Sequence, residues 1–130
     1  DSNTGKRELL FKGTLGRAAF SPDGQSVLMA SDGNTADLWN IETNRWLQHF
    51  QHEAEVSYVA FNPDGKSVIT GSHDKLAIHW SIKTGKRLGQ FKHDRVVTHA
   101  TFSNDGKRIL SSSHDKTVAI WEKESGLTVQ

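Results

Sequence analysis

Seven histidines are the residues in this 130-residue chain best suited to chemistry, since imidazole binds metals and transfers protons near neutral pH. They are His49, His52, His73, His79, His93, His99 and His114. Their spacing contains no His-Glu-x-x-His segment or comparable metal-binding pattern, and the chain has no cysteine. We therefore expect neither a metal ion nor another cofactor.

Serine, histidine and aspartate also occur together near the end of the chain, at His93, Ser111 and Asp115, which is the composition of a hydrolase triad. A serine nucleophile must be exposed beside donors that stabilise an oxyanion. The chain has no Gly-x-Ser-x-Gly segment, which would present such a serine on a sharp turn. The sequence therefore predicts a protein that is not an enzyme.

The elements that carry these residues repeat with a period of 41 residues. The positions that recur in register are Phe20, Phe61 and Phe102, Asp23, Asp64 and Asp105, Gly24, Gly65 and Gly106, and Trp39, Trp80 and Trp121. Four aligned series without a shift indicate three copies of one module. In such repeat proteins each module packs on its neighbours.

Each module has the pattern of four short strands joined by tight turns. In the second module, residues 56–61, 67–70, 76–80 and 87–91 are the expected strands. Pro63 and Gly65 suit the first turn, because proline presets φ and glycine tolerates positive φ. A single four-stranded meander cannot bury two apolar faces by itself. We therefore expect an all-β protein whose sheets stack as blades around an axis.

The repeated strings resemble those of the WD-repeat family of β-propellers. They are Phe20-Ser21-Pro22-Asp23-Gly24, Phe61-Asn62-Pro63-Asp64-Gly65, Ser72-His73-Asp74-Lys75 and Ser113-His114-Asp115-Lys116-Thr117, together with the three strand-ending tryptophans. The resemblance covers essentially the whole chain and implies three four-stranded antiparallel blades. These form a partial ring, or part of a larger or oligomeric ring, because about four to eight blades close a propeller.

The resemblance also implies a buried hydrogen-bond relay, which in many blades of the family joins a histidine, a hydroxyl, an aspartate and the tryptophan. The matching residues are His52, Thr70, Asp74 and Trp80 in the second blade, and His93, Ser111, Asp115 and Trp121 in the third. Such a relay satisfies several buried polar groups at once. The first blade departs from the pattern, because Gly13, Met29 and Gly33 replace the first three members.

The phase of the repeat predicts the blade boundaries. Residues 1–12 form the outer strand of a preceding blade, residues 13–51 the first blade, 52–92 the second and 93–130 the third, whose outer strand is incomplete. Open end blades expose apolar faces. Three arrangements remain open: a longer propeller that includes this segment, a ring made of two or three copies, and a three-blade monomer.

Charge and hydropathy narrow the class of partner. The chain has 16 basic and 15 acidic residues, so no strong field favours nucleic acid. No apolar run approaches the roughly 18 residues that span a bilayer. We expect no nucleic acid and no membrane span. The expected partners are other proteins or peptides, the remaining blades of the same ring, or further copies of the chain.

The resemblance implies a non-catalytic scaffold for protein–protein interaction, which presents loops to its partners. The candidate partner-binding residues are Glu55, Ser57, His73, Thr98 and His114, with Tyr58 and Trp46 as aromatic candidates. One alternative is a self-assembling dimer or trimer ring with no activity beyond association. Another is part of a propeller enzyme or ligand-binding domain whose site lies outside this segment.

Overall fold

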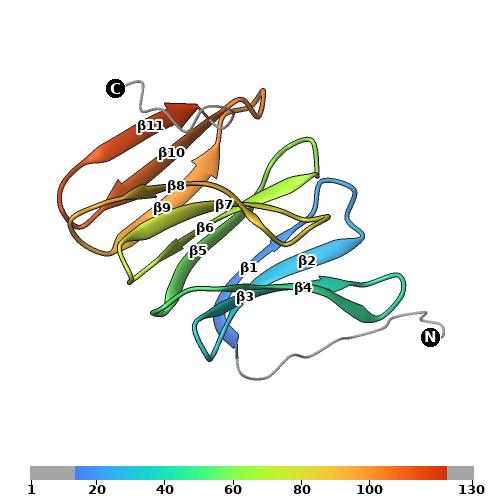
Figure 1. The fold of residues 1–130 in the computed structure, drawn as a ribbon. Helices are drawn as coiled ribbons and strands as arrows, with labels where there is room; N and C mark the ends of the chain where they lie inside the picture. Colours follow the sequence, from blue (N-terminus) through green and yellow to red (C-terminus); the bar gives the residue numbers. More distant parts are fainter. Residues whose placement is uncertain (1–13, 123–130) are drawn as a thin grey trace.

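The computed structural model describes residues 14–122, a range that contains eleven strands and no helix (Figure 1). The strands of the first sheet are β1 (Thr14–Phe20), β2 (Ser26–Ser31), β3 (Thr35–Asn40) and β4 (Arg45–Gln51). Those of the second are β5 (Val56–Phe61), β6 (Ser67–Ser72), β7 (Leu76–Ser81) and β8 (Arg87–Lys92). Those of the third are β9 (Val97–Phe102), β10 (Arg108–Ser113) and β11 (Val118–Glu122).

Each sheet is an antiparallel meander in chain order, and the three sheets do not close into a ring. The prediction of an all-β fold made of antiparallel propeller blades is therefore confirmed. The predicted outer strands in residues 1–12 and at the end of the third blade lie outside the described residues. The exact blade boundaries remain predictions.

The turn between the first and second strands has the same structure in all three sheets. Its glycines all have a φ of 74°, a conformation that strongly favours glycine: Gly24, Gly65 and Gly106. The preceding aspartate carboxylate accepts a backbone N–H two residues further on, at 2.9 Å for Asp23, 2.8 Å for Asp64 and 3.0 Å for Asp105. This shared turn explains why the Asp-Gly pair recurs in every module.

Two apolar cores lie between the sheets. The first contains Leu28, Ala30, Ala36, Leu38 and Phe50 of the first sheet, against Val56, Val59, Val68, Ile78 and Trp80 of the second. The second contains Ile69 and Ala77 of the second sheet, against Val97, Ala100, Phe102, Ile109, Ala119 and Trp121. The middle sheet is thus buried on both faces, and all six residues of β6 are buried. Each sheet is stabilised mainly by its neighbours.

The sheets approach closely where β6 meets β9. A Cβ atom added to Gly71 would lie 2.6 Å from Cγ1 of the buried Val97, so only glycine permits this distance. Nearby, the buried His79 ring on β7 lies edge-on to Phe102 of the third sheet, with ring centroids 5.5 Å apart. The imidazole therefore packs at the same interface.

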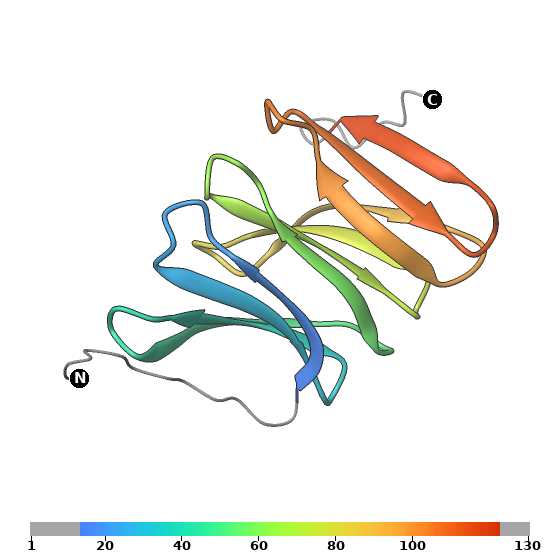
Figure 2. The same ribbon diagram turned by 180° about the vertical axis from the view of Figure 1, so that it is seen from behind.

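The first strands form one edge of the stack. β5 contacts β1 on one side and β9 on the other, and these strands lie side by side in Figure 2. The fourth strands, β4 and β8, lie at the opposite edge of their sheets. The edge formed by β1, β5 and β9 is therefore the inner edge of the propeller arrangement.

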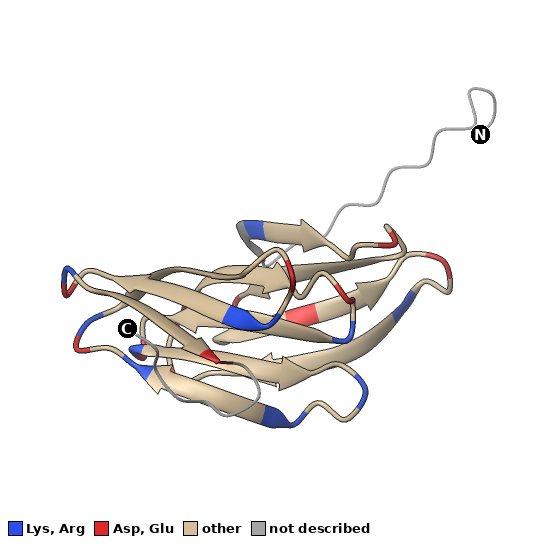
Figure 3. Cartoon of the chain, turned by 90° about the horizontal axis from the view of Figure 1, so that it is seen from above, with Lys and Arg blue, Asp and Glu red and all other residues tan. Residues whose placement is uncertain are grey.

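Charged residues of both signs are interspersed over the described part of the chain (Figure 3). Within residues 14–122 no helix is long and apolar enough to cross a membrane.

Candidate functional site

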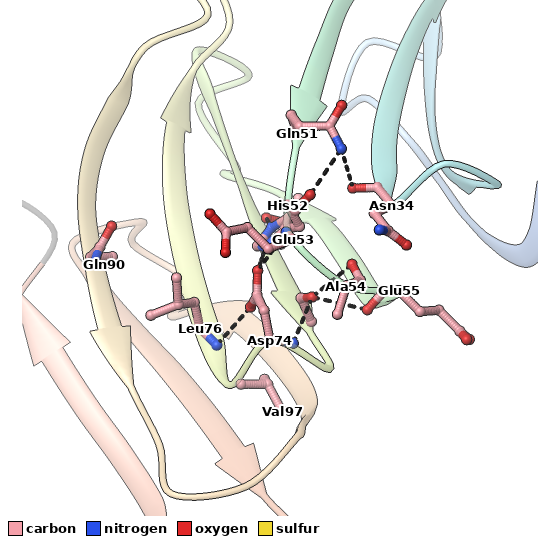
Figure 4. A network of polar contacts seen from close by, with 12 residues as sticks. Asn34, Gln51, His52, Glu53, Ala54, Glu55, Asp74, Leu76, Gln90 and Val97 are labelled. Atoms are coloured by element: carbon pink, nitrogen blue, oxygen red, sulfur yellow. Dashed lines mark hydrogen bonds and ion pairs between the residues drawn. The ribbon is translucent and has the colours of Figure 1, made fainter.

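The second sheet contains a connected network of the four predicted relay residues. His52 Nε2 lies 2.6 Å from Thr70 Oγ1, and His52 Nδ1 lies 2.8 Å from Asp74 Oδ2. Trp80 Nε1 donates to Thr70 Oγ1 at 2.8 Å. The Asp74 carboxylate also accepts the Glu53 N–H at 3.1 Å, as seen from close by in Figure 4. A neutral His52 fits both bonds, with Nδ1–H donating to Asp74 and Nε2 accepting the Thr70 hydroxyl.

The third sheet differs from the predicted relay. His93 Nε2 lies 2.8 Å from Ser111 Oγ, but His93 Nδ1 is closer to Thr117 Oγ1, at 3.2 Å, than to Asp115 Oδ2, at 3.4 Å. The Thr117 hydroxyl in turn donates to Asp115. Trp121 Nε1 is buried and has no hydrogen-bond partner in the described part of the chain, so its predicted place in the relay is not seen.

Two sequence differences account for this change. Thr117 stands where the second sheet has Leu76, so a hydroxyl is inserted between the histidine and the aspartate. Ser111 replaces the β-branched Thr70, whose stiff side chain places its hydroxyl between two ring nitrogens. Ser111 is also fully buried, so a substrate cannot reach the serine of the triad-like set.

The first sheet has a different polar contact in place of the relay. Met29 is buried at the position of the relay hydroxyl, and Gly13 lies outside the described residues. Asp37 Oδ1 on β3 lies 2.8 Å from His49 Nδ1 on β4. Among the described residues, no three metal-ligating side chains lie together.

Burial and hydrogen bonding shift the titration of the relay in opposite ways. Burial lowers the pKa of His52 below its ordinary value, against the hydrogen bond and charge of Asp74. Burial alone would raise the pKa of Asp74, but hydrogen bonds from the Glu53 N–H and from His52 outweigh it and leave the pKa lowered. The Thr117 hydroxyl is the main cause that lowers the pKa of Asp115. The relay therefore pairs a neutral imidazole with an ionised carboxylate near neutral pH.

Lowering the pH is expected to destabilise the protein in two steps. Because the pKa of His52 is lower in the folded than in the unfolded chain, the unfolded chain binds more protons below about pH 6.5, and stability falls there. Protonation of Asp74 and Asp115 causes a second loss below about pH 4. Urea denaturation across this range measures both steps. The His52→Gln variant is expected to lack the first step, and an unchanged profile would contradict the assignment.

The predicted partner-binding residues lie at one end of the second and third sheets. We call this end the loop face; it comprises residues 52–55, 73–75, 93–96 and 114–117. Glu55, His73 and His114 are exposed there. Ser57 and Thr98 are half-buried, and their hydroxyls donate to backbone carbonyls of Val97 and Ser112, respectively. These two hydroxyls are used within the fold, so we remove Ser57 and Thr98 from the candidate surface.

A row of planar side chains crosses the three inner strands near this face. Arg17, Tyr58 and His99 occupy the same repeat position on β1, β5 and β9. The Arg17 guanidinium lies over the Tyr58 ring, 5.0 Å from its centroid, and the Tyr58 and His99 ring centroids are 4.8 Å apart. Of these three residues only Tyr58 is a partner-binding candidate by sequence, although the 41-residue spacing relates all three. Trp46 lies on the outer strand β4 and packs edge-on to Trp39.

Comparison with known protein families gives two matches that together cover more than half of the chain. The family described as "WD domain, G-beta repeat" matches residues 44–81 and 85–122. The chain belongs to the WD-repeat family. No curated protein matches the sequence. WD repeats generally mediate protein–protein interactions, and members of the family are typically scaffolds without enzymatic activity.

Each matched WD repeat is offset from the sheets by one strand. Residues 44–81 comprise β4 of the first sheet and β5–β7 of the second, and residues 85–122 comprise β8 of the second and β9–β11 of the third. One WD repeat therefore supplies the outer strand of one blade and the inner strands of the next. This overlap links neighbouring blades through the chain as well as through their packed faces.

Proposed function

We propose that this chain is a non-catalytic scaffold whose loop face and inner strands bind other proteins. The row of Arg17, Tyr58 and His99 is the observation that carries the proposal. Residues that dominate the energy of protein interfaces are enriched in tyrosine and arginine and cluster near the centre of the contact. Here a half-buried tyrosine lies between an exposed arginine and an exposed histidine, beside the exposed loop residues.

The geometry of the row favours binding because it limits the motion of its members before a partner arrives. Arg17 lies over the Tyr58 ring, which restricts a side chain that otherwise has many rotamers. Less conformational entropy is then lost when a partner binds. The edge of the guanidinium still offers N–H donors, and Arg17 forms no ion pair with the described residues.

Variants of the row are expected to weaken partner binding. A partner isolated with the full chain as bait is titrated by calorimetry against two variants. Tyr58→Leu keeps an apolar side chain but removes the ring, and Arg17→Gln removes the guanidinium together with its contact to that ring. Each is expected to weaken binding by about tenfold or more. Glu55→Lys and His73→Glu test the adjoining loops in the same assay.

The matched control is Trp46→Leu, which changes a partly exposed aromatic residue at the outer edge and is expected to leave affinity unchanged. Thermal unfolding of each variant shows whether it remains folded. A partner whose affinity is indifferent to both Tyr58→Leu and Arg17→Gln would exclude this surface.

A further inference from the structure

A pocket of about 410 Å³ opens on the loop face between the second and third sheets. Three segments line it: the turn between β6 and β7, the connection between β8 and β9, and the turn between β10 and β11. The lining residues are Lys75, Asp94, Arg95, Val96 and His114.

Hydrogen bonds to the main chain hold the walls of the pocket in place. The His93 N–H donates to the Lys75 carbonyl at 2.8 Å, and the His114 N–H donates to the Val96 carbonyl at 3.1 Å. The Ser113 hydroxyl donates to the Arg95 carbonyl at 3.1 Å. The connection between β8 and β9 is therefore fixed to both sheets, and the pocket exists before any ligand binds.

The side chains that line the pocket include two cations, Lys75 and Arg95, and one carboxylate, Asp94. Lys75 and Arg95 form no ion pair with any residue in the described part of the chain. Asp94 is the single carboxylate that lines the pocket, which is also lined by these two cations and by His114. Val96 and the alkyl parts of the basic side chains add apolar surface. A ligand that matches this pocket therefore carries an anionic group next to an apolar group.

The junction between the first and second sheets has the same framework with a different set of side chains. Its residues Asn34, Glu53, Ala54, Glu55 and His73 stand 41 positions before those that line the pocket. The His52 N–H donates to the Asn34 carbonyl at 2.9 Å, and the His73 N–H donates to the Glu55 carbonyl at 2.8 Å. Figure 4 shows this connection beside Asp74. The fold therefore forms these bonds without Lys75 or Arg95.

The backbone at Lys75 also favours another residue. Its φ is 77°, in the left-handed region, where lysine is uncommon and asparagine is enriched. Asn34, at the equivalent position, has a φ of 67°. Lys116, at the equivalent turn of the third sheet, has a φ of 72°, so a lysine in this conformation also belongs to the repeat pattern. The residues that distinguish the pocket most clearly from the first junction are therefore Arg95 and Val96, which stand where that junction has Ala54 and Glu55.

We propose that this pocket binds an aspartate or glutamate side chain of a protein partner. Arg95 pairs with the carboxylate through its planar N–H donors, and Lys75 adds a second charge. Val96 contacts an apolar side chain next to the acidic residue. This assignment rests on the proposed scaffold function and specifies the chemistry of the partner.

The test replaces the pocket residues with those of the first junction. The triple variant Lys75→Asn, Arg95→Ala and Val96→Glu uses side chains that the same framework already accommodates. The probe is a fluorescein-labelled peptide of alternating glutamate and leucine, with a glutamine–leucine peptide for comparison. Anisotropy is expected to show about tenfold tighter binding of the glutamate peptide by the full chain, weakening with salt. The triple variant is expected to lose this preference.

The matched control is Lys66→Asn with Lys107→Ala, which removes two cations from the turns at the opposite end of the sheets. It is expected to keep the affinity within about twofold. Equal binding of both peptides, unchanged affinity in the triple variant, or equally effective competition by inorganic phosphate would each overturn the assignment. A partner that depends on Tyr58 but not on Lys75 or Arg95 overturns the pocket assignment and leaves the scaffold function standing.

Discussion

Replacing Phe102 with alanine is expected to lower the free energy of unfolding by about 3 kcal/mol, as for other buried aromatic residues. Replacing Phe20, at the same position of the first repeat, is expected to cost less than about 0.5 kcal/mol. Phe102 is 8% exposed and packs on the second sheet, where it meets His79, whereas Phe20 is 69% exposed. The two variants thus remove the same type of side chain from equivalent positions, at the ends of β1 and β9.

The difference between these variants measures what a neighbouring sheet contributes. Phe20 and Phe102 share the same local propensity and turn geometry. These factors therefore cannot cause a difference between the losses in the free energy of unfolding of the two variants. Phe61, half-buried against the first core, is expected to fall between them. Urea denaturation followed by circular dichroism gives the three free energies. Equal costs at Phe20 and Phe102 would contradict stabilisation by stacked sheets.

The fold could be predicted from the sequence because each position of the repeat has equivalent positions 41 residues apart, so the strand pattern can be compared between copies. The strands predicted at residues 76–80 and 87–91 are observed as Leu76–Ser81 and Arg87–Lys92. The strand predicted at residues 67–70 extends to Ser72, through Gly71. Glycine has low β propensity, and Gly71 is held in the sheet by pairing with β5 and β7, while Ser72 pairs with β5.

The candidate site could be predicted only in part, because the same relay pattern of residue types does not lead to the same hydrogen bonds in both sheets. The relay pattern predicts the same contacts in both blades, whereas hydrogen bonds join His52, Thr70 and Trp80 in the second sheet and Trp121 Nε1 in the third has no partner among the described residues. In the third sheet Ser111 stands at the position of Thr70, and Thr117 lies between His93 and Asp115. No strand pattern specifies how these side chains pair. The pocket at Lys75 and Arg95 could not be predicted from the sequence alone, because it forms where separate turns of the second and third sheets meet. Comparison of equivalent repeat positions would nevertheless have revealed its change of charge.

Replacing Thr70 with valine is expected to cost about 3 kcal/mol, because two buried hydrogen bonds are lost together. Valine keeps the shape of threonine but removes the hydroxyl that accepts from Trp80 and donates to His52. His52 Nε2 and Trp80 Nε1 are then buried without a hydrogen-bond partner. Replacing Ser111 with alanine removes only the bond to His93, so a cost of about 1–2 kcal/mol is expected.

Double-mutant cycles separate the relay from ordinary packing. Thr70→Val combined with Trp80→Phe is expected to show a coupling of about 1 kcal/mol, because each change removes one end of the same hydrogen bond. Ser111→Ala combined with Trp121→Phe is expected to show little coupling, since Trp121 Nε1 does not reach the serine. Urea denaturation of all the variants supplies both cycles. Equal coupling in the two sheets would mean that Trp121 shares the relay of its blade, and the distinction between the second and third sheets would fail.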